Sequence, residues 1–171
     1  DKHWSRGLGD VYKRQALDRS GLVGEDGPTH SGNYDIAYLR CIPNMVICTP
    51  SDENETRKLL TTAYLHNGPA SVRYPRGTGP NSNVDKDLKP LKIGEANIIN
   101  EGSSEIVILN FGTLLNEANQ ISKELKATLV DMRFVKPLDE KLLRKLFKKA
   151  KVFISIEDGS IMGGAGSAVQ E

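Results

Sequence analysis

Apolar residues are concentrated in two regions of the chain, which are separated by the polar segment 77–90. In the first region, the compact apolar runs Met45–Cys48 and Ala70–Tyr74 lie next to prolines and have the length of buried strands. The segment between them places apolar residues at helical spacing, and these form its predicted buried stripe: Leu59, Leu60, Ala63 and Tyr64. The order strand, helix, strand predicts a βαβ unit with two parallel strands and a right-handed crossover.

The ends of this helix carry residues that favour helix termini. Asp52 is the predicted N-cap, Glu55 is its capping-box partner three residues later, and Asn67–Gly68–Pro69 is a stop signal. A shorter helix is predicted upstream, and its buried face should consist of the residues that recur at intervals of three and four: Tyr34, Ala37, Tyr38 and Cys41. Before that helix, Ala16–Arg19 should end a strand that leads into a glycine-rich loop.

The second region repeats the alternation of strands and helices. Its predicted strands are Ile93–Asn100, Glu105–Phe111, Thr128–Met132 and Val152–Ile156. Its predicted helices are Leu114–Leu125 and Leu138–Phe147, and a further helix opens near Gly164. The fold class is therefore α/β, with a parallel sheet in the first region and a second, parallel or mixed sheet after it. Because the sequence stops at Glu171 within a predicted helix, we expect the chain to be a fragment.

Composition restricts the functional class without assigning one. Apolar residues make up 38% and charged residues 26% of the 171 residues, and the net charge of +1 argues against a broad nucleic-acid-binding surface. No apolar run approaches the length of a membrane span. Residues 1–15 show neither helical nor strand periodicity and are predicted to be disordered or non-native.

Cys41 and Cys48 lie in apolar surroundings and are predicted to be buried free thiols in a reducing compartment.

The stiff loop from Gly24 to Gly32, which contains three glycines and a proline, carries the side chains best suited to chemistry. It holds Asp26, a fixed acceptor, and His30, a titratable donor and acceptor. Arg76 directly follows a predicted strand, so it should reach the same carboxyl edge of the sheet, where ligands bind in α/β proteins. A surface turn with incidental polar residues is the alternative, and Arg73 is predicted to make a structural ion pair.

Two other motifs favour structural roles. Gly164–Ala165–Gly166 follows a strand, and a close helix–strand contact that needs glycine explains it better than dinucleotide binding. Lys136 and Asp139 are predicted to shape a turn and a helix start.

Combined motifs give the chain a specific resemblance. The segment 24–30, GEDGPTH, is similar to a loop of the transketolase family of thiamine diphosphate enzymes. Other stretches resemble the 1-deoxy-D-xylulose-5-phosphate synthase branch of that family: Tyr38–Met45, Pro50–Glu55, Val72–Gly77, Asp131–Asp139 and Ile161–Ser167. The resemblance runs from about residue 16 to the end. It implies a partial pyrimidine-binding domain over 16–80, a linker over 81–90 and a truncated transketolase C-terminal domain over 91–171.

The resemblance also implies an activity. Members of this branch condense pyruvate with D-glyceraldehyde 3-phosphate with loss of CO₂, which supplies isoprenoid, thiamine and pyridoxal biosynthesis. It implies thiamine diphosphate and Mg²⁺ as cofactors, bound mainly by parts that are missing from this chain, and therefore a fragment that is inactive alone. It further implies a cytoplasmic homodimer without a nucleic-acid or membrane partner.

The resemblance assigns four site residues. Arg76 and Arg19 match arginines at the substrate phosphate, where a guanidinium suits an anion. Asp26 and His30 match the catalytic pair beside the substrate hydroxyls and the reactive carbon, with His30 as the proton-transfer partner. No cofactor- or metal-binding residue is expected in the chain. The alternatives are a non-catalytic binding module of the same fold, a transketolase, or a 2-oxo-acid dehydrogenase beta-type chain.

Overall fold

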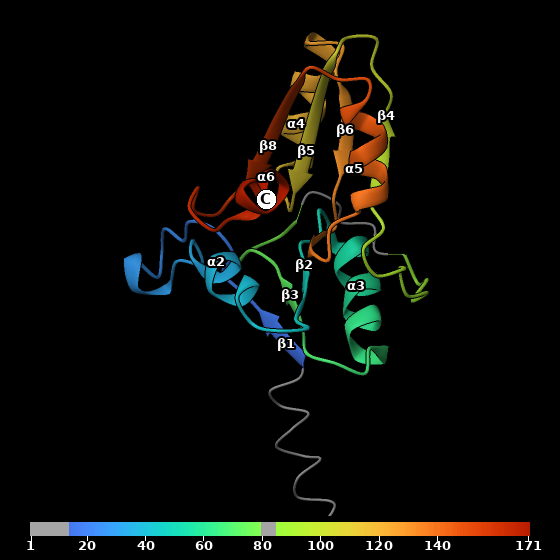
Figure 1. Cartoon of the computed structure of the whole chain (residues 1–171). Helices are drawn as coiled ribbons and strands as arrows, with labels where there is room; N and C mark the ends of the chain where they lie inside the picture. The colour runs from blue at the N-terminus through green and yellow to red at the C-terminus, as the bar shows by residue number, and fades with distance from the viewer. Residues whose placement is uncertain (1–13, 80–84) are drawn as a thin grey trace, which may run out of the picture.

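The structure is a computed structural model that describes residues 14–79 and 85–171. It contains two four-stranded sheets that lie one above the other (Figure 1). The first sheet has the order β1-β3-β2-β7, and its strands are β1 (Arg14–Leu17), β2 (Val46–Cys48), β3 (Ala70–Arg73) and β7 (Phe134–Lys136). The second has the order β4-β6-β5-β8, and its strands are β4 (Asn97–Asn100), β5 (Ile106–Phe111), β6 (Thr128–Asp131) and β8 (Val152–Glu157).

The predicted βαβ unit is present. β2 and β3 pair in parallel, and helix α3 (Glu53–Leu65) connects them. The Asp52 carboxylate accepts the backbone N–H of Glu55 at 2.8 Å, so the predicted N-cap is confirmed. The prediction that Glu55 is the capping-box partner is wrong, because the Glu55 carboxylate pairs with Arg133 instead of returning to the backbone N–H of Asp52. The predicted stripe is partly wrong as well: Leu60 and Tyr64 are exposed, and the buried residues of the helix are Leu59, Thr62 and Ala63.

Helix α2 (Asp35–Arg40) lies where the sequence predicts a short helix, but its buried face was predicted wrongly. Ile36 and Leu39 are buried, whereas Tyr34 and Tyr38 are exposed. A helix of six residues buries little more than one turn, and the two aliphatic side chains fill the core better than the hydroxyl-bearing rings. Cys41 is exposed, which corrects its predicted burial, while Cys48 is buried; both are free thiols.

The second sheet is mixed, because β4 runs antiparallel to β6 while β5, β6 and β8 are parallel. Its helices are α4 (Leu115–Glu124), α5 (Glu140–Phe147) and α6 (Ala165–Gln170). In Figure 1, α5 and α6 lie on one face of the sheet and α4 on the other. Within the described ranges, no helix is both long and apolar enough to cross a membrane.

Strand β7 was not predicted, and it joins the two parts of the chain. Its residues follow the second sheet's β6 in sequence, yet it pairs antiparallel with β2 of the first sheet. Lys136 extends this contact, because its Nζ donates to the backbone oxygens of Arg40 and Ile42, both at 2.8 Å. A single hydrophobic cluster spans both sheets and includes Ile36, Ile47, Leu109, Val130 and Leu143. The sheets are therefore packed as one body with a shared core.

The predicted non-native segment 1–15 is corrected at its end. Residues 1–13 lie outside the described residues, but Arg14 and Gln15 form half of β1 and pair with Ala70 and Ser71 of β3. Leu91 likewise contacts the first region, because its backbone N–H donates to Thr62 Oγ1 at 2.8 Å.

Candidate functional site

Three of the four predicted site residues lie together at the carboxyl edge of the first sheet. Arg19 follows β1, Arg76 follows β3, and Asp26 lies in the β1–α2 segment (residues 18–34) that connects β1 to α2. Arg19 Nε donates to Asp26 Oδ2 at 2.7 Å, and Arg76 Nη1 pairs with the same oxygen. The Asp26 carboxylate therefore lies between two guanidinium groups, and we call Arg19, Asp26 and Arg76 the arginine pair site.

Electrostatics keep this site charged. The hydrogen bond from Arg76, followed by the one from Arg19, lowers the pKa of Asp26 to about 2. The same contact with Asp26 raises the pKa of Arg19. Solvent reaches the site, because the side chains of Arg19, Asp26 and Arg76 are 31%, 22% and 43% exposed. Two cations and one carboxylate thus face solvent at neutral pH.

Two further carboxylates touch the guanidinium groups from outside. Asp18 pairs with Arg19, and Glu25 Oε2 lies 3.4 Å from Arg76 Nη2. The Glu25 side chain is 85% exposed, so its ion pair is a weak surface contact that a stronger anion replaces at little cost. A phosphate has the charge and the acceptor geometry to take this position, because guanidinium groups bind it through two parallel hydrogen bonds.

His30 does not bond to the arginine pair site. It ends the short 3₁₀ helix Pro28–His30 and is exposed. Its Nδ1 lies 3.0 Å from Thr29 Oγ1, and within the described residues no hydrogen bond or ion pair joins its ring to Arg19, Asp26 or Arg76. The imidazole Nε2 is therefore free of intramolecular bonds in the described part of the chain.

The two ends of the β1–α2 segment are tied together at its base. Gly21 and Gly32 exchange backbone hydrogen bonds of 3.3 and 2.9 Å. A Cβ at Gly32 would overlap the carbonyl oxygen of Arg19, so this close approach requires glycine. The position of Arg19 is thereby fixed to the far end of the segment.

Arg73 makes the predicted structural ion pair. Its side chain is 1% exposed, and its Nε donates to Asp35 Oδ2 at 2.7 Å. Its Nη1 donates to Asp158 Oδ1 at 2.5 Å, and its Nη2 donates to the carbonyl of Gly32 at 3.1 Å. Desolvation opposes the charge, yet the two carboxylates raise the pKa of Arg73 above its usual value. The sequence predicted the ion pair but not its partners, which lie 38 and 85 positions away.

Gly164 and Gly166 serve the predicted helix–strand contact. A Cβ on Gly166 would lie 2.6 Å from Ser155 Oγ of β8. The Glu157 carboxylate accepts the backbone N–H groups of Ala165 and Gly166 at 2.8 and 2.9 Å. A carboxylate of the chain itself thus takes the place that a bound phosphate would have at the start of α6, which corrects the dinucleotide alternative. Asp139 starts α5 as predicted, since it accepts the N–H of Leu142.

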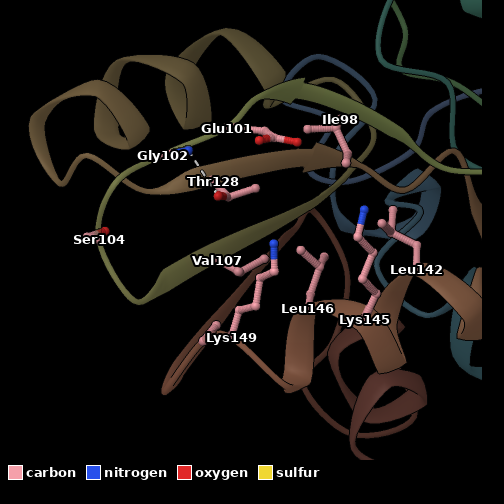
Figure 2. Close-up of a pocket in the computed structure, with 11 residues that line it drawn as sticks. Ile98, Glu101, Gly102, Ser104, Val107, Thr128, Leu142, Lys145, Leu146 and Lys149 are labelled. Atoms are coloured by element: carbon pink, nitrogen blue, oxygen red, sulfur yellow. Dashed lines mark hydrogen bonds between the residues drawn. The ribbon is translucent and has the colours of Figure 1, made fainter.

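A cavity of about 110 Å³ lies away from this site, between α5 and the second sheet (Figure 2). Lys145, Lys149, Leu146, Thr128 and Glu101 belong to its wall. It contains none of the predicted site residues. Among the described residues, no group of three or more histidine, cysteine, aspartate or glutamate side chains is arranged to hold a metal ion.

Asp131 is a buried carboxyl group that sequence reasoning missed. It ends β6, it is 1% exposed, and its Oδ2 accepts Ser51 Oγ at 2.7 Å. Its Oδ1 has no hydrogen-bond partner among the described residues. Burial raises the pKa of Asp131 to about 7, and the hydrogen bond from Ser51 opposes this shift only in part. Asp131 follows two apolar residues of β6, so its burial at the end of a buried run could have been expected, but the unpaired oxygen could not.

The raised pKa of Asp131 predicts a pH-dependent stability. The folded chain retains a proton that the unfolded chain releases near pH 4, so Asp131 lowers the free energy of unfolding as the pH rises toward about 7. Asp131→Asn removes this penalty. The gain in free energy of unfolding over the original chain should therefore be roughly 3 kcal/mol larger at pH 8 than at pH 5. Urea unfolding at both pH values measures this, with Asp139→Asn as the matched control. An Asp131→Asn variant with the pH dependence of the original chain would contradict it.

The family comparisons agree with the two-sheet organisation. The model for the transketolase pyrimidine-binding domain matches residues 8–81, and the model for the transketolase C-terminal domain matches residues 94–171. The first match begins inside the segment that we expected to be non-native.

Curated relatives are similar over most of the chain. A 1-deoxy-D-xylulose-5-phosphate synthase of Pseudomonas fluorescens (strain Pf0-1) is 57% identical over 156 residues, which is 91% of this chain and 24% of that protein. The synthase of Stutzerimonas stutzeri (strain A1501) is 58% identical over the same share of the chain and 24% of its own length. The chain thus spans about a quarter of the length of these relatives.

Solved structures share the fold. A structure described as "Split gene transketolase, inactive beta4 tetramer" has a TM-score of 0.79 at 28% identity, over 91% of this chain and 51% of that one. The transketolase of Campylobacter jejuni has a TM-score of 0.63 at 20% identity, over 99% of this chain and 32% of that one, which supports the fold alone. With both domain models matched and the fold shared, the chain belongs to the transketolase family.

Proposed function

We propose that the chain forms the acceptor-binding part of a 1-deoxy-D-xylulose-5-phosphate synthase. Such an enzyme condenses pyruvate with D-glyceraldehyde 3-phosphate and releases CO₂. The observation that carries the proposal is the arginine pair site, because two guanidinium groups face solvent around one carboxylate at the carboxyl edge of the first sheet. The identity of 57% to a synthase of that name supports this choice over a transketolase or a 2-oxo-acid dehydrogenase chain.

Arg76 and Arg19 bind the phosphate of the aldehyde in this proposal. Glu25 leaves Arg76 when the phosphate arrives, and Asp26 holds both guanidinium groups in place beforehand. Preorganised donors of this kind lower the entropic cost of binding. In this proposal Asp26, which lies in the β1–α2 segment, also faces the hydroxyl groups of the substrate.

His30 acts as the proton-transfer residue in this proposal. Its Nδ1 is close to Thr29 Oγ1, and a hydroxyl both donates and accepts hydrogen bonds. The Thr29 hydroxyl can therefore form a hydrogen bond with Nδ1 in either tautomer of the imidazole. Nε2 then either donates a proton to the substrate or accepts one from it. The exposed position of His30 leaves this nitrogen accessible to a ligand.

Thiamine diphosphate would supply the electron sink for the decarboxylated pyruvate in such an enzyme. The described residues do not fit the cofactor's metal ion, because no acidic or histidine cluster is arranged to bind Mg²⁺. For the complete enzyme we further propose Mg²⁺ dependence, a homodimer, a cytoplasmic location, and a place in isoprenoid, thiamine and pyridoxal precursor synthesis.

A chimaeric synthase tests the proposed function. The matching quarter of the Pseudomonas fluorescens relative is replaced by this chain's sequence, and product formation from pyruvate and D-glyceraldehyde 3-phosphate is measured with thiamine diphosphate and Mg²⁺. We expect turnover by the chimaera. A folded chimaera that binds pyruvate but forms no product would favour the binding-module alternative.

The 171-residue chain alone is expected to form no product under the same conditions. It spans about a quarter of the relatives' length, and a structurally similar transketolase chain is described as an inactive tetramer. Detectable deoxyxylulose phosphate from the purified chain would contradict this expectation. The chimaera, assayed in parallel, shows that the conditions support the reaction.

A further inference from the structure

Asp158 follows the last residue of β8 in the second sheet, yet it is connected to both ends of the β1–α2 segment. It directly follows β8, and its Oδ1 accepts Arg73 Nη1 at 2.5 Å. Its Oδ2 accepts Ser20 Oγ at 3.3 Å. Ser20 is the residue after Arg19, so one carboxylate reaches the start of the segment directly and its end through Arg73.

The contacts continue from Arg73 to the arginine pair site. Arg73 Nη2 donates to the carbonyl of Gly32, and Gly32 exchanges backbone hydrogen bonds with Gly21. The backbone N–H of Ser20 donates to the carbonyl of Tyr74 at 3.0 Å, which fixes the start of the segment to the residue after β3. The residue after Arg19 is therefore held by two contacts, one from its backbone to Tyr74 and one from its side chain to Asp158.

Close packing leaves little freedom in this arrangement. A Cβ on Gly21 would lie 3.0 Å from Asp158 Oδ2, so the carboxylate packs directly against the backbone of the segment. Arg73 is nearly fully buried and Asp35 holds its Nε, so the guanidinium cannot turn toward another partner without leaving Asp35 unpaired. A substitution at Asp158 should therefore alter the position of the β1–α2 segment.

We propose that Asp158 and Arg73 are positioning residues for the arginine pair site, so that the second sheet sets the affinity for the phosphorylated acceptor. The inference rests on the proposed function, because it takes the arginine pair site to be the phosphate site. Neither residue touches the substrate. Their effect is exerted through Ser20, Gly21 and Gly32, which hold Arg19 and the loop that bears Asp26.

The test uses Asp158→Asn in the chimaeric synthase. Asparagine keeps the size of the side chain but loses the charge that faces Arg73. We expect the KM for D-glyceraldehyde 3-phosphate to rise about 3- to 30-fold, which is the size of effect that residues in a contact network have on a distant binding site. The KM for pyruvate should stay within about twofold. Hydrogen exchange of peptides that cover residues 19–33 should become faster, and exchange in α4 should be unchanged.

The matched control is Asp139→Asn, which changes the carboxylate that caps α5 and should alter neither measurement. Unchanged exchange in residues 19–33, or an equal rise in both KM values, would overturn the positioning role. Arg76→Ala, assayed beside it, separates the two proposals. If Arg76→Ala impairs only the phosphorylated aldehyde while Asp158→Asn has no effect, the phosphate site stands and the positioning role fails. If Arg76→Ala shows no preference for the phosphorylated aldehyde, the phosphate role that the proposed function gives to this site fails.

Discussion

Replacing His30 by asparagine in the chimaeric synthase is expected to lower kcat by roughly 10²- to 10⁴-fold, the range for a lost acid–base group. Asparagine keeps a donor and an acceptor of similar reach but takes up no proton near neutral pH. The melting temperature should barely change, because His30 is exposed and its imidazole bonds only to Thr29 in the described part of the chain. Steady-state kinetics and a thermal midpoint on one preparation measure both effects.

The competing role for His30 is structural, with the imidazole holding the loop. That role predicts either much of the original kcat in His30→Asn or a loss of stability together with the rate. His66→Asn is the matched control, because His66 follows α3 and lies outside the arginine pair site. A kcat near that of the unmodified enzyme in His30→Asn would rule out proton transfer by this residue.

Arg76→Ala is expected to raise the KM for D-glyceraldehyde 3-phosphate by roughly 10- to 100-fold, with a smaller effect on pyruvate. A charge-assisted hydrogen bond contributes about 1.5–3 kcal/mol, which corresponds to this range. Arg76→Lys should recover only part, since an ammonium group cannot bind a phosphate through a fork of two hydrogen bonds. The folded structure should be retained, because the Arg76 side chain is 43% exposed.

The discriminating measurement for Arg76 is kcat/KM with D-glyceraldehyde, which lacks the phosphate. Arg76→Ala should affect this substrate little. An equal loss with both aldehydes would show that Arg76 acts on the whole site, for example by holding Asp26, rather than on the phosphate.

Local patterns in the sequence predicted most of the secondary structure. The βαβ unit follows from two apolar runs, an N-cap at Asp52 and a stop at Asn67–Gly68–Pro69, all of which are local signals. Strand β7 could not be found in this way, because its three residues carry no period and its partner β2 lies about ninety positions earlier. The buried face of α2 was predicted wrongly for a related reason: tertiary packing selects Ile36 and Leu39 from a helix too short to establish a stripe.

The candidate site was predicted to a different extent. The topology of parallel strands predicted that Asp26 and Arg76 share an edge, and the ion pair between them agrees with this. The addition of Arg19 came from the family resemblance, since its place before the loop carries no signal of its own. Asp158 and Asp131 were missed because their importance depends on contacts across the two sheets, with Arg73 and with Ser51. Such contacts depend on tertiary structure that sequence spacing does not encode.

The most direct test of the arginine pair site is inhibition of the chimaeric synthase by inorganic phosphate. Phosphate alone has the group that Arg19 and Arg76 are proposed to bind, and it undergoes no reaction. We expect inhibition that is competitive with D-glyceraldehyde 3-phosphate but not with pyruvate, and an inhibition constant at least about 10-fold weaker in Arg76→Ala. Inhibition that does not compete with the aldehyde, or that is equally strong in Arg76→Ala, would contradict a phosphate site at these residues.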